Sequence, residues 1–251
     1  LRPAVQANAL AVYYQPLIDL KTGNICALEA LLRWPQEDGS MIFPDRFIPL
    51  AESSGLIDTL GAWVLNQACM FCAKQQQNGN SELSIAVNLS FAQFKDGNLP
   101  QIVKGALETS QLAPEHLELE LTESILADDN GNVIQQLEQI KSLGVTFAID
   151  DFGTGYSSLT YLKHLPAEII KIDQSFVRDM LVDEDDLAIV KGVIGLANAF
   201  QRGVIAEGVE SAEHGKALLE LGCEQAQGFG IAKPMPAERV PEWIEGWKPQ
   251  W

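Results

Sequence analysis

The stretch Val145-Thr146-Phe147-Ala148-Ile149-Asp150-Asp151 is an apolar run that ends in two adjacent acids. A short apolar run rich in β-branched and aromatic residues predicts a buried strand. Six further segments also end in a carboxylate or an amide, and one of them carries a lysine: Ile25–Glu29, Ser84–Asn88, Leu117–Glu120, Ile169–Asp173, Val204–Glu207 and Glu224–Gln227. Stretches long enough for a helix separate most of them. A barrel or an open α/β sheet gathers such strand ends on one face, so the sequence predicts a ring of acids with one lysine there.

The order of these elements predicts an α/β fold, and the 251 residues match the length of a (β/α)8 barrel, about 250 residues. Val12–Asp19 is predicted to be a strand, joined by a turn at Lys21–Asn24 to a second strand that ends at Glu29. This hairpin predicts one strand antiparallel to the others. Helices are expected over Pro44–Ser53, Asp58–Gln77, Leu99–Ser110, Val133–Leu143, Asp185–Phe200, Ala212–Leu221 and Pro236–Trp247.

The formal net charge of −17 repels long nucleic acids and anionic membrane surfaces. A small phosphorylated substrate is not excluded, because bound divalent cations can invert the local charge. No apolar run approaches the roughly 18 residues of a membrane-spanning helix, so we expect no membrane insertion. The chain begins at Leu1 rather than methionine, so we expect one domain over residues 1–251 that was excised from a longer protein.

The four cysteines are too few for a disulfide scaffold, which favours a reducing, cytoplasmic setting. Cys69 and Cys72 have the C-x-x-C spacing that zinc sites use. They lie in an apolar helical run, however, and no second cysteine or histidine pair completes a site. We therefore expect them to be ordinary core residues.

Asp150 and Asp151 are the centre of the predicted site. Neighbouring side chains of a strand point to opposite faces, so both acids enter one site only if the strand ends there. Two carboxylates this close repel and raise each other's pKa unless a cation lies between them. A helix N-cap or an acidic turn is the alternative. Because Glu29, Glu120 and Glu207 recur at the ends of other strands, the pattern favours a metal site.

Asn88 and Lys171 extend this site. The amide oxygen of Asn88 can bind a hard cation without adding charge. Lys171 lies between isoleucines and could orient a nucleophilic water or stabilise a phosphoryl oxygen. A Schiff-base lysine is the competing interpretation, although Asp173 shares its face and would keep it charged. The glycine-rich run Gly153–Ser158 lacks the P-loop spacing, and we interpret it as a mobile loop beside the acids.

Short motifs follow one another in order from Tyr14-Gln15-Pro16 to Lys233-Pro234. They are Glu29-Ala30-Leu31 with Leu32-Arg33-Trp34, Val87–Ser90, Glu120–Glu123, Asp150–Ser158, Lys171–Asp173, Ala206–Glu210 and Gln227-Gly228. Together they resemble the EAL-domain family of cyclic-di-GMP phosphodiesterases, over essentially the whole chain. The resemblance implies a modified (β/α)8, TIM-like barrel with one antiparallel strand, in agreement with the hairpin above.

The resemblance also implies a reaction, which is metal-dependent hydrolysis of one phosphodiester bond of cyclic-di-GMP to linear pGpG. It implies two Mg2+ or Mn2+ ions. The implied ligands are Glu29, Asn88, Glu120 and Asp150 for one ion, and Asp150, Asp151 and Glu207 for the other. Lys171 would hydrogen-bond the attacking water. The residues that would contact the substrate, or support those that do, are Gln15, Arg33, Asp173, Glu210 and Gln227.

Glu123 would anchor the loop Phe152–Ser158, which the family uses to couple metal binding to dimerisation. The resemblance thus implies a homodimer through this loop and the adjacent helix, and a covalently linked sensor or GGDEF domain. The module would work in the cytoplasm, alone or as part of a membrane-anchored protein. Two alternatives stay open, a catalytically silent EAL domain that acts as a cyclic-di-GMP receptor and an unrelated barrel enzyme such as a lysine-dependent aldolase. Silent receptors usually lose part of the motif set, whereas this chain keeps it.

Overall fold

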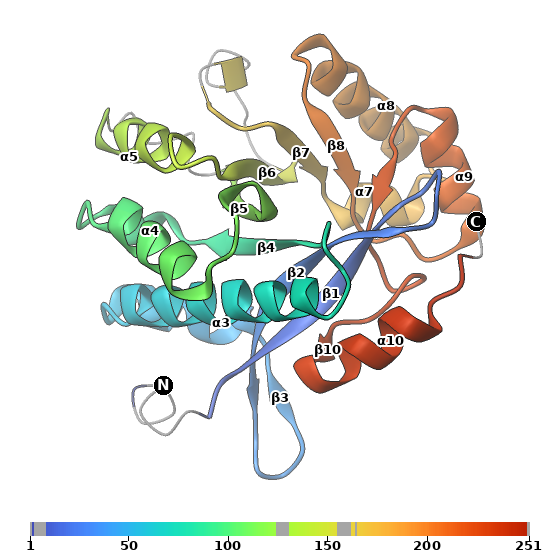
Figure 1. The fold of residues 1–251 in the computed structure, drawn as a ribbon. Coiled ribbons are helices and arrows are strands. Elements are labelled where there is room, and N and C mark those ends of the chain that lie inside the picture. Colours follow the sequence, from blue (N-terminus) through green and yellow to red (C-terminus); the bar gives the residue numbers. More distant parts are fainter. Residues whose placement is uncertain (1, 3–8, 124–130, 155–161, 164, 250–251) are drawn as a thin grey trace.

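Eight strands close into a barrel in the computed structural model, which describes residues 2, 9–123, 131–154, 162–163 and 165–249. Around the barrel the order is β1-β9-β8-β7-β6-β5-β4-β2, and β2 pairs with β1 to complete the ring (Figure 1). The strands are β1 (Ala11–Asp19), β2 (Ile25–Pro35), β4 (Ser84–Leu89), β5 (Leu117–Thr122), β6 (Thr146–Phe152), β7 (Ile169–Ile172), β8 (Gly203–Ala206) and β9 (Gln225–Ala226). This closed α/β barrel confirms the predicted fold class.

Strand β1 runs antiparallel to both of its barrel neighbours, β2 and β9. The other neighbouring pairs around the ring are parallel. The hairpin at the start of the chain therefore gives the barrel its one antiparallel strand, as predicted. Two short strands, β3 (Met41–Ile42) and β10 (Met235–Pro236), pair antiparallel with β2 and β1 respectively.

The prediction that the second strand ends at Glu29 is wrong. Strand β2 continues to Pro35, because β1 still offers it paired backbone, with Gln15 opposite Glu29 and Ala11 opposite Arg33. Glu29 thus lies in the middle of a strand. The same long register brings Arg33 onto the strand that carries Glu29.

The helices lie outside the strands (Figure 1). They are α2 (Pro44–Ser53), α3 (Ile57–Gln77), α4 (Leu99–Ser110), α5 (Gly131–Lys141), α7 (Gln174–Asp179), α8 (Glu184–Ala199), α9 (Ala212–Glu220) and α10 (Val240–Gly246). The sequence predicted these positions except for α7, whose six residues are too few to show a helical period. Helix α10 starts later than predicted, because Ala237–Arg239 form a 3-10 turn before it.

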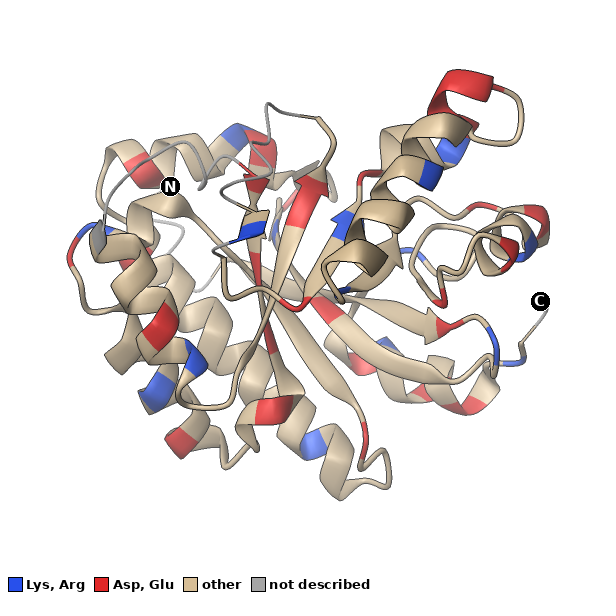
Figure 2. Cartoon of the chain, turned by 90° about the horizontal axis from the view of Figure 1, so that it is seen from above, with Lys and Arg blue, Asp and Glu red and all other residues tan. Residues whose placement is uncertain are grey.

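The pleat of the strands separates the core from the predicted site. In β5, Leu117, Leu119 and Leu121 are buried on one face, and Glu120 lies on the other. Lys171 alternates in the same way with its isoleucine neighbours in β7. The aliphatic face packs under the helices, so the charged residues are directed to the interior of the barrel. Figure 2 shows acidic positions on the central strands as well as on the outer helices.

Cys69 and Cys72 are fully buried free thiols in α3, which confirms the expectation of core residues. The one group of potential metal-binding side chains found among the described residues lies elsewhere, on β6 and directly after β8. A search of the described helices for one long and apolar enough to cross a membrane found none.

Candidate active site

Lys171 is the centre of the site and is completely buried in β7. Its Nζ lies 2.6 Å from a carboxylate oxygen of Glu120 in β5 and 2.7 Å from one of Glu207, directly after β8. Asp150 in β6 and Glu29 in β2 follow at 3.5 Å and 3.7 Å. Burial lowers the pKa of Lys171, but these four carboxylates outweigh it and raise the pKa well above its usual value. The lysine is therefore charged.

One lysine cannot neutralise this many acids. Burial, followed by repulsion from other carboxylates, raises the pKa of Glu207 to about 8 and that of Asp151 to about 6. The pKa of Glu120 is also well above its usual value, for the same two reasons. The close contact between Glu120 and Lys171 is compatible with this shift, because Lys171 is shared among four acids. The site has an excess of negative charge that additional cations would relieve.

The donor set fits divalent cations. Asp150, Asp151 and Glu207 each offer a carboxylate oxygen, and these atoms lie within 4.8 Å of one another. Oxygen Oε2 of Glu120 is buried without a hydrogen-bond partner. Hard cations such as Mg2+ take carboxylate oxygens as ligands, and a buried carboxylate oxygen without a donor is costly unless something pairs with it.

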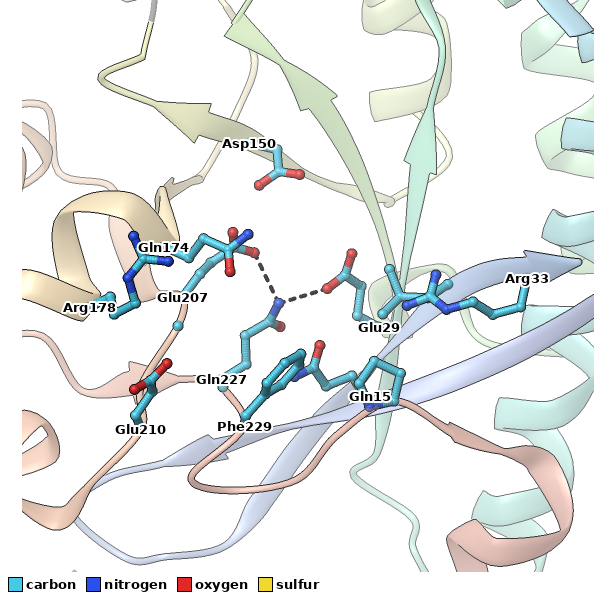
Figure 3. Close-up of a pocket in the computed structure, with 14 residues that line it drawn as sticks. Gln15, Glu29, Arg33, Asp150, Gln174, Arg178, Glu207, Glu210, Gln227 and Phe229 are labelled. Atoms are coloured by element: carbon cyan, nitrogen blue, oxygen red, sulfur yellow. Dashed lines mark hydrogen bonds between the residues drawn. The ribbon is translucent and has the colours of Figure 1, made fainter. Parts of the chain in front are cut away.

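Two amides hold Glu29 in place, one from β4 and one from the residue directly after β9. Nδ2 of Asn88 donates to Oε1 of Glu29 at 2.7 Å. Nε2 of Gln227 donates to Oε2 of Glu29 at 2.7 Å and also to Glu207 at 2.9 Å, so it links the two acids (Figure 3). Burial raises the pKa of Glu29, but Lys171 and these two amides outweigh it, so the net shift is downward.

A kink in β6 brings Asp150 and Asp151 to the same side, although the strand does not end there as the sequence predicted. The pairing with β7 shifts between Ile149 and Phe152, which is a bulge. Asp151 adopts a left-handed backbone with φ of 55°, and its N–H donates to Oδ1 of Asp150 at 3.0 Å. The bulge thus directs two adjacent side chains to one side of the strand, whereas a regular pleat would direct them to opposite faces.

Glu123 lies directly after β5 and is buried, and its Oε2 accepts a hydrogen bond from the N–H of Gly153 at 3.2 Å. This contact ties it to the segment that follows the two aspartates, where it was predicted to act. Residues 155–158 of the predicted loop lie outside the described residues. The predicted dimer contact through that loop is therefore untested.

A cleft of about 360 Å3 opens beside the acids. The lining includes four residues that the resemblance assigned to the substrate: Gln15, Arg33, Glu210 and Gln227. The fifth, Asp173, is not part of this lining and instead caps α7 by accepting from the N–H of Ser175 at 3.0 Å. The Asp173 carboxylate also contributes to the raised pKa of Asp151, so it is close enough to influence the acid cluster.

Sequence analysis missed Gln174, Arg178 and Phe229, which also line the cleft. Figure 3 shows Gln174 and Arg178 across the cleft from Arg33. The two residues are four apart on α7, so they lie on one face of that helix. Because α7 was not predicted, this spacing was not recognised. The four-residue spacing of Gln174 and Arg178 directly after Asp173 was the sequence feature that could have indicated them.

Two glycines let the segment after β9 approach the segment after β8 closely. A Cβ on Gly228 would lie 2.2 Å from backbone atoms of Val209, and one on Gly230 would lie 2.4 Å from those of Glu210. Backbone hydrogen bonds join the same segments, including Val209 N–H to Gln227 C=O at 3.1 Å and Gly230 N–H to Val209 C=O at 2.9 Å. This close approach sets Gln227 beside Glu29 and Glu207.

The structure is thus an α/β barrel that holds a buried lysine and a cluster of acids beside a polar cleft, at the carboxyl ends of its strands, where barrels of this kind carry their functional sites. The family description "EAL domain" matches residues 1–234. The chain belongs to the EAL domain family.

Two relatives from Pseudomonas aeruginosa show the extent of the similarity. The chain is 43% identical over 240 residues to the bifunctional diguanylate cyclase/cyclic di-GMP phosphodiesterase MucR, covering 96% of this chain and 35% of that protein. It is 39% identical over 248 residues to the cyclic di-GMP phosphodiesterase NbdA, covering 99% of this chain and 32% of that protein. The chain thus spans about a third of the length of these relatives.

A solved structure described as the MucR phosphodiesterase in complex with c-di-GMP superimposes with a TM-score of 0.90 at 43% identity. The match covers 95% of this chain and 97% of that one. The similarity therefore extends to the whole fold of the domain.

Proposed function

We propose that this chain hydrolyses cyclic-di-GMP to linear pGpG with the help of divalent cations. The carrying observation is the buried, charged Lys171 among the carboxylates of Glu29, Glu120, Asp150 and Glu207 beside a polar cleft. The names of MucR and NbdA support cyclic-di-GMP as the substrate. In the reaction, the oxygen of water forms a bond to phosphorus while the bond between phosphorus and the 3′ oxygen breaks. One proton of the water ends on that 3′ oxygen, which becomes the 3′ hydroxyl of pGpG.

The residues that would hold Mg2+ or Mn2+ are Glu29, Asn88, Glu120 and Asp150 for one ion, and Asp150, Asp151 and Glu207 for a second. Bound divalent cations lower the pKa of a water and neutralise the charge that develops on the phosphate. The unpartnered oxygen of Glu120 and the grouped oxygens of Asp150, Asp151 and Glu207 support this assignment.

The remaining roles belong to residues of the chain alone. Lys171 carries three N–H donors and a stable charge, so it can orient the attacking water. A lysine held charged is a poor nucleophile, which disfavours Schiff-base chemistry. Arg33, whose guanidinium lies on the wall of the cleft opposite α7 (Figure 3), presents a planar fork that fits a phosphate oxygen pair. Gln15 and Glu210 would contact a base, which their place in the lining of the same cleft supports.

Turnover of cyclic-di-GMP by the purified chain, with Mg2+ or Mn2+ and resolution of products by chromatography, tests the proposal. We expect pGpG to appear only when a divalent cation is present. Glu29→Ala, which removes one ligand and one partner of Lys171, should abolish it. Saturable binding of cyclic-di-GMP without product would point to the receptor instead. A near-normal rate in Glu29→Ala would contradict the role of that ligand.

We further propose that the module is joined to a sensor or GGDEF domain and forms a homodimer in the cytoplasm. The length of the relatives, of which this chain covers about a third, supports the first point. Sedimentation of the chain with and without Mg2+ tests the second. A monomer at all concentrations would contradict it.

A further inference from the structure

The wall of the cleft formed by α7 has no role in the mechanism above. Arg178 and Gln174 lie there on one helix face, and Glu210 lies on the same side of the cleft (Figure 3). Arg33 is on the opposite wall, where the proposed function places a phosphate. The cleft thus has a second arginine, on the same side as a carboxylate and across from Arg33.

The backbone of α7 is held firmly at both ends. At its start, Asp173 caps the helix by accepting from the N–H of Ser175. Near its end, Nε2 of the buried His214 contacts the carbonyl oxygen of Arg178 at 3.1 Å, and Nδ1 lies 3.0 Å from Oγ of Ser211. A carbonyl only accepts, so Nε2 carries the proton. The base of the Arg178 side chain is therefore fixed in position.

The α7 wall is also fixed against the segment that carries Glu210. Gly208 has φ of 74°, and a Cβ there would lie 2.6 Å from Cβ of Gln174. This contact sets the distance between the helix and the segment that leads to Glu210. Arg178 and Glu210 are thus presented together by two segments in direct contact.

The head of the Arg178 side chain is only weakly held. Among the described residues it forms an ion pair with Asp179 at 3.5 Å, and the side chains are 53% and 49% exposed. An ion pair with this exposure contributes little. The guanidinium can therefore exchange this partner for a ligand in the cleft.

A guanidinium and a carboxylate on one side of the cleft could together bind both the hydrogen-bond acceptors and the hydrogen-bond donors of guanine. Guanine offers O6 and N7 as neighbouring acceptors, which arginine binds with two parallel donors. Guanine also has donors at N1 and N2, which a carboxylate accepts. Adenine has an amino donor where guanine has O6, so it would face the guanidinium with the wrong sign.

We propose that Arg178 is a specificity-determining residue that reads O6 and N7 of one guanine of the substrate, while Glu210 accepts from N1 and N2 of the same base. The proposal rests on the proposed function, because it assumes that cyclic-di-GMP binds in this cleft. It assigns α7 the task of selecting guanine over adenine.

The test measures binding and turnover of three cyclic dinucleotides by the whole chain with Mg2+: cyclic-di-GMP, cyclic GMP-AMP with two 3′–5′ linkages, and cyclic-di-AMP. Arg178→Ala should weaken cyclic-di-GMP binding by roughly ten- to a hundredfold, the discrimination typical of a bidentate arginine–guanine contact. Binding of cyclic-di-AMP should change far less, so the preference for guanine narrows. Arg178→Lys keeps the charge but not the fork and should also lose much of the selectivity.

Arg239→Ala is the matched control, because Arg239 is an exposed arginine in the 3-10 turn before α10, outside this cleft. The control should bind like the unaltered chain. Equal losses for all three dinucleotides in Arg178→Ala would overturn the proposal, since they would mean a general charge effect. Unchanged binding would overturn it too, while leaving the proposed function intact. If the unaltered chain did not bind cyclic-di-GMP, both this proposal and the proposed function would be overturned.

Discussion

Replacing Lys171 by Met should destabilise the folded chain strongly, although methionine has a similar length. Nζ of Lys171 has two carboxylate oxygens within 2.7 Å and two more within 3.7 Å, and the side chain has no exposed area. Removing one partner of a buried ion pair costs about 3–5 kcal/mol, because the remaining charge is left buried and unpaired. For a domain of this size, each kcal/mol lowers Tm by roughly 2–4 °C, so we expect a fall of about 6–20 °C.

The size of the loss should depend on pH in a defined direction. Glu207 has a pKa of about 8 even with Lys171 present, and without the lysine it should rise further. An acid with a raised folded pKa stabilises the fold while it is protonated, and this contribution is lost as pH rises through that pKa. The penalty of Lys171→Met should therefore be smaller at pH 6 than at pH 8.5.

Thermal unfolding followed by circular dichroism, in chelator at both pH values, measures this effect. Lys21→Met is the matched control, because its ion pair with Glu224 at 2.5 Å is exposed, with side chains 59% and 50% accessible. That pair should contribute at most about 1 kcal/mol. If Lys171→Met unfolded within 2 °C of the unaltered chain, roughly one kcal/mol or less, the charged cluster would not be the stabilising feature described here.

Gly228→Ala should lose about 1–3 kcal/mol of unfolding free energy, because the new Cβ would lie 2.2 Å from a backbone nitrogen. Gly192→Ala in α8, with open space around it, is the control, and equal urea midpoints would contradict the clash. Burial raises the pKa of the Cys69 and Cys72 thiols to about 12, so a thiol reagent at pH 8 should label them only after denaturation; rapid labelling of folded chain would argue against this. Mn2+ should bind more tightly as pH rises from 6 to 8.5, because the cation displaces a proton from Glu207, and a flat calorimetric profile would count against that displacement.

The sequence alone determined the alternation of strands and helices, the antiparallel first strand and most of the acids in the site. These features are local. An apolar run of β-branched residues indicates a strand wherever the run occurs, although β2 and β6 continue past the acids that were expected to end them. The direction of Lys171, between two isoleucines, is set by the pleat. The resemblance to the EAL family extended this to Gln15 and Arg33, which no period or composition indicates.

Only the tertiary structure decided which carboxylates contact Lys171, and how Asp150 and Asp151 share one side of β6. The first depends on the register of five strands far apart in the chain, and a shift of one residue would turn any of these side chains away. The second depends on a bulge and a left-handed residue, which no strand pattern announces. The position of Arg178 in the cleft was also decided by the tertiary structure. Its six-residue helix, α7, is too short to show a helical period in the sequence, and its place is set by contacts with Gly208 and His214.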